Sequence, residues 1–186
     1  LAVDEDVDEF KPGDRVACAG AGYALHADIV AVPKNLCVKI PDSVSFEEAA
    51  FTTVGAIAMQ GLRQANPTLG ERVVVIGLGL IGQLTVQMLK ANGCFVIGVD
   101  LDDKPIENAL KISGADIALS GKKQDVKSIV MEITKGFGAD AVIITAATSS
   151  NDPIKLAGEI SRDKGRVILV GDVGLTLPRA PYYMKE

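Results

Sequence analysis

From Arg72 to Val170 the chain repeats one hydrophobic pattern. A short run of nearly continuous apolar residues is followed by a longer stretch in which apolar residues recur every three or four positions. Continuous apolar runs are typical of strands covered on both faces, as in parallel sheets, whereas the longer stretches have the period of helices. The strands are expected at Arg72–Ile76, Phe95–Val99, Ile117–Leu119, Ala139–Ile144 and Val167–Val170.

The stretches between these strands carry helix end signals. A helix over Leu80–Asn92 would end before Gly93, and a helix over Lys104–Ser113 has Pro105 in its first turn. Strands and helices therefore alternate, which predicts an α/β fold with a doubly wound parallel sheet, that is, a Rossmann domain. Two further helices are expected at Asp125–Lys135 and from Pro153 to about Arg162.

Residues 1–44 have a different pattern, with turn signals and short extended pieces but no helical period. The sequence "SFEE", Ser45 to Glu48, then forms a capping box, which predicts one long helix from Phe46 to about Ala65. We therefore expect a boundary near Ser45, between a β-rich segment of residues 1–44 and an α/β domain of residues 45–186.

Composition narrows the classes of partner. Of the 186 residues 48% are hydrophobic, enough for a core, and the net charge of −5 without a long basic block argues against nucleic acid or an anionic membrane. The longest apolar run, Val73 to Gly82, is far shorter than the roughly 20 residues of a membrane span. Scattered cysteines without CxxC spacing favour reduced, buried thiols in a cytoplasmic protein. A small-molecule ligand is expected.

Because the chain lacks an initiator Met, we also expect that its first residue is a cut edge.

The segment "VVVIGLGLIG" brings glycines to the turn after the first of these strands. Gly77 would allow the tight turn, Gly79 would let a pyrophosphate approach the main chain, and Gly82 would let the helix pack on the strand. Asp100 ends the next strand, 18 residues after Gly82. At this place a carboxylate is expected to bind the ribose hydroxyls of NAD and to repel the 2′-phosphate of NADP. The combination predicts an NAD site, with NADP disfavoured. There are two alternatives. In one, the glycines serve packing alone and Asp100 caps the next helix. In the other, the glycine-rich turn belongs to a methyltransferase.

Two later strand ends would border the same crevice, because ligands of open α/β sheets lie beyond the carboxyl ends of the strands. One is Thr145-Ala146-Ala147, whose small side chains leave room for a flat group, and the other is Gly171-Asp172-Val173. Ordinary short loops would look the same in sequence. The residues expected at the cofactor are Gly77, Leu78, Gly79, Leu80, Ile81, Gly82, Asp100, Thr145, Ala146, Ala147, Gly171, Asp172 and Val173.

Several motifs together resemble the medium-chain dehydrogenase/reductase superfamily, whose best-known members are zinc-dependent alcohol dehydrogenases. They occur in the family order and are "KPGDRV" (11–16), "ADIVAVPKN" (27–35), "IPDSVSFEEAA" (40–50), "TVGAIAMQGL" (53–62), "GLGLIG" (77–82) and "GRVILVG" (165–171). Two longer stretches, residues 18–67 and 144–160, resemble the dehydrogenase half of a bi-domain oxidoreductase. The resemblance implies hydride transfer between a nicotinamide and an alcohol or carbonyl substrate. It also places the nicotinamide near Thr53, Val54 and Gly171 to Val173, the phosphates on Leu78 to Ile81, and the adenine beside Thr145 to Ala147.

By the same resemblance, residues 1–44 would be the C-terminal part of a GroES-like catalytic domain, and the sixth strand of the sheet would follow Glu186. Members of the superfamily pair through that strand, so a homodimer is expected. A zinc ligand is doubtful, because "AAFTTVGA" (49–56) holds neither Cys nor His where the family often has a Cys. No side chain is a convincing general acid or base, and His26 is expected to pack or face solvent. A non-catalytic, NAD(H)-sensing Rossmann domain is the alternative.

Overall fold

The computed structural model describes residues 2–185 in two compact units, Leu1–Ala56 and Ile57–Glu186. The units divide inside a helix, between Ala56 and Ile57, whereas the sequence pattern changes near Ser45. The assignment of residues 1–44 to a GroES-like domain stays a prediction. Within residues 2–185, no helix has both the length and the apolar character needed to cross a lipid bilayer.

The first unit is built on a short antiparallel pair of strands, β1 (Val16–Cys18) and β2 (Cys37–Lys39). A 3-10 turn, Lys34–Leu36, leads into β2, and the helices α1 (Phe46–Ala49) and α2 (Thr52–Ala65) follow. The capping box is confirmed, because the Glu48 amide donates to Ser45 Oγ over 3.1 Å and the Ser45 amide to Glu48 Oε2 over 2.8 Å.

The prediction of one long helix over residues 46–65 is wrong. The helix is interrupted at Ala50 and Phe51, and the Thr52 hydroxyl donates to the carbonyl of Ala49 over 2.7 Å. A threonine side chain that takes a helix carbonyl competes with the backbone amide that would continue the helix. This competition accounts for a second helix starting at Thr52.

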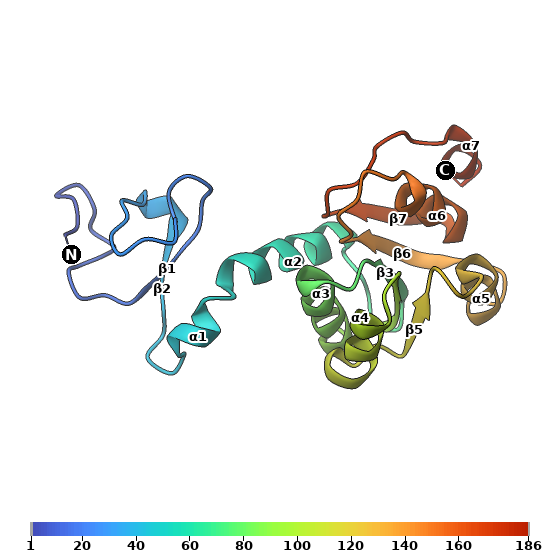
Figure 1. The fold of residues 1–186 in the computed structure, drawn as a ribbon, viewed down its shortest axis with the longest axis horizontal. Helices are drawn as coiled ribbons and strands as arrows, with labels where there is room; N and C mark the ends of the chain where they lie inside the picture. Colours follow the sequence, from blue (N-terminus) through green and yellow to red (C-terminus); the bar gives the residue numbers. More distant parts are fainter. Residues whose placement is uncertain (1, 186) are drawn as a thin grey trace. The chain divides into compact units, whose positions relative to one another are not determined.

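The second unit contains a five-stranded parallel sheet in the order β5-β4-β3-β6-β7, flanked by helices (Figure 1). This confirms the predicted Rossmann fold. The strands are β3 (Arg72–Ile76), β4 (Phe95–Asp100), β5 (Ile117–Ser120), β6 (Ala139–Ile144) and β7 (Ser161–Leu169). The helices are α3 (Leu80–Ala91), α4 (Asp103–Asn108) continued by a π-helical turn (Ala109–Ser113), α5 (Val126–Ile133), α6 (Asp152–Ile160) and α7 (Arg179–Tyr183).

Alternate residues of the strands enter two separate cores, one on each face of the sheet. Val73 and Val75 of β3 pack in the cluster that holds α2 and α3, whereas Val74 and Ile76 pack in the cluster that holds α5 and α6. All four are at most 6% exposed. Burial on both faces explains why all four residues from Val73 to Ile76 are apolar.

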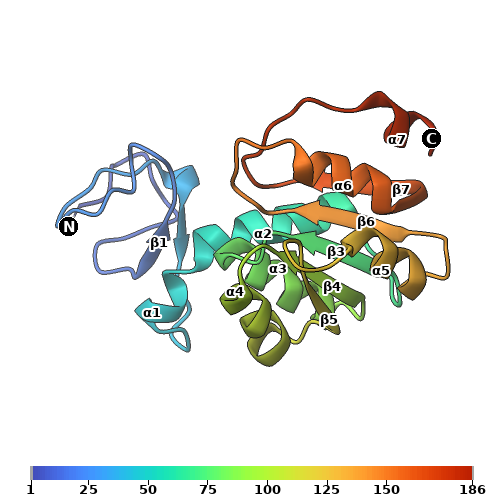
Figure 2. The same cartoon turned by 45° about the vertical axis from the view of Figure 1, so that its right-hand side comes forward.

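The last strand, β7, begins earlier than the sequence predicts. Its first half, Ser161 to Arg166, is mostly polar and contains a register shift against β6, so the apolar pattern marks only the second half. The helix α7, which we did not predict, lies beside α6 (Figure 2). Tyr182 of α7 donates its hydroxyl to the carbonyl of Ile154 over 2.7 Å, and its ring fills the space above Gly158.

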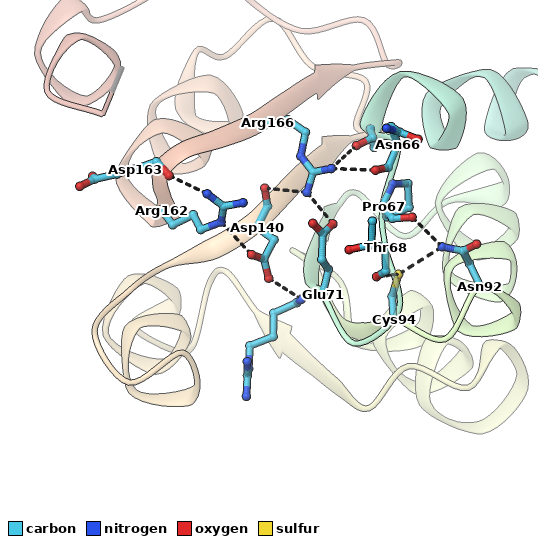
Figure 3. Close-up of polar contacts among 12 residues, drawn as sticks. Asn66, Pro67, Thr68, Glu71, Asn92, Cys94, Asp140, Arg162, Asp163 and Arg166 are labelled. Atoms are coloured by element: carbon cyan, nitrogen blue, oxygen red, sulfur yellow. Dashed lines mark hydrogen bonds and ion pairs between the residues drawn. The ribbon is translucent and has the colours of Figure 1, made fainter.

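Charged side chains connect neighbouring strands at the end of the sheet where the parallel strands begin (Figure 3). Arg166 of β7 donates to the carbonyls of Ala65 and Asn66 at the end of α2, over 2.6 and 2.8 Å, and pairs with Glu71. Arg162 pairs with Asp140 of β6 over 2.7 Å. This network fixes α2, β3, β6 and β7 at the edge opposite to the predicted cofactor residues.

Candidate dinucleotide-binding site

The turn between β3 and α3 requires glycine at its first position. Gly77 has a φ of +94°, in the left-handed region that L side chains rarely adopt. A Cβ there would lie 2.5 Å from the amide nitrogen of Ala146, which follows β6. The turn is therefore held tightly against the end of the neighbouring strand β6. The Gly77 amide also donates to the carbonyl of Val99 over 2.8 Å.

Gly82 and Gly79 differ in what surrounds them. A Cβ on Gly82 would overlap the carbonyl oxygen of Gly77, so this glycine allows α3 to pack on the turn, as the sequence predicts. By contrast, beyond Gly79 and its immediate chain neighbours, no heavy atom of the described residues lies within 4 Å of a Cβ built on Gly79. Packing within residues 2–185 therefore explains Gly77 and Gly82, and it does not explain Gly79.

Gly79 is also the N-terminal cap of α3, a helix of 12 residues. No side chain from the described part of the chain caps this helix. The amides of Leu80, Ile81 and Gly82 begin the helix and have no carbonyl one turn earlier to bind. These amides and the helix dipole make this end attractive to an anionic group, and Gly79 leaves the approach open.

The carboxylate of Asp100, at the end of β4, is hydrogen-bonded to the glycine turn. Its Oδ2 accepts from the Leu78 amide over 2.6 Å, and its Oδ1 accepts from the Asp102 amide over 3.0 Å. The Leu78 side chain is 1% exposed and packs over Gly98, where a Cβ would come within 3.0 Å of it. Leu78 thus lies in the glycine turn with its amide bound by Asp100, and its expected contact with a phosphate stays a prediction.

The two later strand ends lie together at the same edge. Thr145 donates its hydroxyl to the Gly77 carbonyl over 2.5 Å, and the Gly171 amide donates to Ile144 over 2.9 Å. A bridge pairs Thr148 with Val173, and Val173 is itself 8% exposed, so its side chain belongs to the core. The expected residues of the second unit are therefore gathered around the ends of β3 and β6. At these strands the order of the sheet reverses, and such a point is where α/β folds bind ligands.

Thr53 and Val54 lie in the other unit, in the first turn of α2. The Thr53 hydroxyl donates to the carbonyl of Cys18 over 3.3 Å. Their expected position beside the nicotinamide stays a prediction.

Sequence reasoning missed two lysines that lie beside the loop after Asp100. Lys122 pairs with Asp102 over 2.9 Å, and Lys123 pairs with Asp103 over 2.6 Å. The hydrogen bond to Asp102, and then the charges of the nearby carboxylates, raise the pKa of Lys122. No motif marks these pairs, because the lysines follow β5 and the aspartates follow β4, so the partners are distant in sequence.

Gln83, in the first turn of α3, was also missed. Its Nε2 donates to the carbonyls of Leu78 and Pro105 over 2.8 and 2.9 Å, and its Oε1 accepts from the Ser113 hydroxyl over 2.5 Å. Gln83 thus joins the glycine turn to α4. No motif marks a single glutamine in this role.

Among residues 2–185, no three His, Cys, Asp or Glu side chains come together as a ligand set for a metal. A catalytic zinc needs three protein ligands, so the described residues do not by themselves fit one. Of the three cysteines, Cys94 is buried as predicted, but Cys18 and Cys37 are half-buried.

The profile of the family described as zinc-binding dehydrogenase matches residues 81–186, from α3 through the rest of the sheet. The chain belongs to this family. The match confirms the resemblance to the medium-chain dehydrogenase/reductase superfamily drawn from the motifs.

Relatives with names of the same kind support this. The sorbitol dehydrogenase of Homo sapiens is 29% identical over 91% of this chain and 55% of its own length. The alcohol dehydrogenase of Geobacillus stearothermophilus is 34% identical over 81% of this chain and 44% of its own length. Among solved structures, the 2R,3R-butanediol dehydrogenase of Bacillus subtilis has a TM-score of 0.80 at 25% identity, covering 98% of this chain and 59% of that one. This chain spans about half the length of the relatives it matches.

Proposed function

We propose that this chain is the NAD(H)-binding part of a dehydrogenase that interconverts an alcohol, such as a polyol, and the corresponding carbonyl compound. One observation carries the proposal: an open glycine and the first amides of α3 lie beside the carboxylate of Asp100, at the point where the strand order reverses. The names of the relatives supply the substrate class, because they include sorbitol and butanediol dehydrogenases.

In this proposal the chain binds and orients the cofactor. The amides of Leu80 to Gly82 would donate to the pyrophosphate, which would pass over Gly79. Asp100 would accept hydrogen bonds from the ribose hydroxyls, since each of its oxygens has only one donor among the described residues and can accept a second. The bound nicotinamide would supply the hydride chemistry.

Charge at the ribose end favours NAD(H) over NADP(H). A 2′-phosphate would approach the carboxylate of Asp100 as a like charge. The nearby cations Lys122 and Lys123 are paired with Asp102 and Asp103, so they compensate carboxylates that are already there. Phosphorylated ribose would therefore be disfavoured.

The alternative is a domain that senses NAD(H) without catalysis. The relatives reported above are dehydrogenases by name, and the family is a dehydrogenase family, which does not favour the alternative.

Fluorescence titration with NADH and NADPH tests the proposal. We expect tighter binding of NADH than of NADPH. In Asp100→Asn we expect a loss of NADH affinity of roughly ten- to a hundredfold and a smaller gap to NADPH, because a hydrogen bond to a charged acceptor contributes about 1.5–3 kcal/mol. The asparagine keeps an oxygen that can accept from the Leu78 amide. Glu132→Gln, which removes one exposed charge at the end of α5, is the matched control and should bind like the unmutated chain. Tighter NADPH binding, or unchanged NADH affinity in Asp100→Asn, would contradict the proposal.

A further inference from the structure

The first unit places two cysteines directly opposite each other. In the register of β1 and β2, Cys18 pairs with Cys37. One step further along the ladder, the Ala19 amide donates to the Leu36 carbonyl over 2.8 Å. Pairs in an antiparallel ladder alternate between hydrogen-bonded and non-hydrogen-bonded, so Cys18 and Cys37 form a non-hydrogen-bonded pair. At such a pair the Cα atoms approach to about 4.5 Å, a separation that a disulfide can bridge.

The two sulfur atoms are already close to each other. Their Sγ atoms are 3.7 Å apart, against about 2.05 Å in a disulfide bond. Neither thiol is fully buried, and Cys18 lines a hollow of the first unit together with Thr53 and Phe46, so a small reagent can reach the pair. Burial, and then the neighbouring Cys18 thiol, raises the pKa of Cys37.

The third cysteine provides an internal comparison. Cys94 precedes β4 in the second unit and is 2% exposed. Burial raises the pKa of its thiol. Its environment is that of an inert, structural cysteine, whereas the pair in the first unit has both access and a partner.

We propose that Cys18 and Cys37 are a redox modification site that a small disulfide, such as oxidised glutathione, converts into an intrachain disulfide. One cysteine thiolate attacks a sulfur of the reagent and releases one glutathione thiol. The second cysteine, after losing its proton, attacks the mixed disulfide and releases the second glutathione thiol. Two cysteine thiols are thereby oxidised, and one reagent disulfide is reduced to two thiols.

The bond would cross-link β1 to β2 next to the carbonyl that Thr53 binds. The Cys18 carbonyl accepts from the Thr53 hydroxyl at the start of α2. Oxidation would therefore alter the strand to which this helix start is attached. Neither cysteine is among the residues expected at the cofactor, so the thiol pair can be tested without NAD(H).

Mass spectrometry of the folded chain after treatment with oxidised glutathione tests this proposal. We expect the loss of two hydrogen atoms without an attached glutathione, a peptide map that links Cys18 to Cys37, and full recovery with dithiothreitol. Cys94→Ser should behave identically. Cys18→Ser and Cys37→Ser should each gain a single glutathione at the remaining partner, since no second thiol is there to displace it.

Two results would overturn the proposal. One is a folded, unmutated chain that keeps both thiols, or that holds glutathione stably on either one, under conditions that oxidise a reference dithiol. The other is a linkage that includes Cys94. Both results are read from the unmutated chain and Cys94→Ser, so they hold even if a serine variant in β1 or β2 fails to fold.

Discussion

Substituting Gly79 separates the requirements of the fold from those of a ligand. Gly79 has φ −68° and ψ −165°, which valine adopts without strain. A Cβ there meets no heavy atom of residues 2–185 within 4 Å beyond its immediate chain neighbours. Replacing a glycine in a compatible conformation also lowers the entropy of the unfolded chain, which stabilises the folded state by about 0.4–1 kcal/mol. We therefore expect Gly79→Val to change the free energy of unfolding by at most about 1 kcal/mol.

The same substitution should abolish most cofactor binding. The valine side chain would occupy the approach to the amides that begin α3. Hydrogen bonds to a charged group contribute about 1.5–3 kcal/mol each, so losing two of them costs about 3–6 kcal/mol. That loss corresponds to a roughly 10²- to 10⁴-fold weaker affinity for NADH.

Gly77→Val is the matched comparison, two residues away in the same turn. Its φ of +94° and the clash with Ala146 should lower the free energy of unfolding by about 2 kcal/mol or more. Thermal melting by circular dichroism and NADH fluorescence titration measure both effects. If Gly79→Val melts like the unmutated chain and binds NADH equally well, the pyrophosphate does not pass over Gly79 and the reasoning is refuted.

Two further predictions concern stability. Arg166→Met should lower the free energy of unfolding by about 2–3 kcal/mol in chemical denaturation, because Glu71 and two helix-end carbonyls lose their donor, while Arg63→Met at an exposed position should change it by less than about 0.5 kcal/mol. Equal losses in the two variants would contradict the role of the network. Tyr182→Phe should cost about 1 kcal/mol at neutral pH. Burial raises the pKa of Tyr182 above 10.0, so its contribution is complete below about pH 10 and is lost as the pH rises through the folded pKa. The variant should therefore lose less stability than the unmutated chain between neutral pH and pH 11, and identical curves would argue against this assignment.

The strands could be predicted because burial on both faces leaves a nearly continuous apolar run. Ala139–Ile144 is an example, apolar except at Asp140, and the structure reproduces it residue for residue. The polar first half of β7 escaped this signal, since Arg162 and Arg166 hold it to its neighbours by ion pairs rather than by apolar packing. The break before Thr52 escaped as well, because the capping box reports where a helix starts and not where a side chain interrupts it.

The predicted cofactor residues show the same division. Glycine spacing and Asp100 could be recognised because backbone geometry demands particular residue types at particular distances along the chain. The hydrogen bond from the Leu78 amide to Asp100 could not be recognised from the sequence, nor could the ion pair between Lys122 and Asp102. These contacts join segments that are distant in sequence, and many residue types would satisfy them.

The hydrogen bond from the Leu78 amide to Asp100 has a consequence for protein engineering. Under the proposed function, replacing Asp100 is the direct way to weaken a preference for NAD(H) over NADP(H). A substitution that removes the carboxylate would also remove the acceptor that holds the glycine turn through the Leu78 amide. The cofactor preference and the geometry of the turn would therefore change together. A redesign would have to introduce a neutral acceptor of similar reach, such as serine or asparagine, together with the new cation. Libraries that fully randomise position 100 would mostly sample loosened turns.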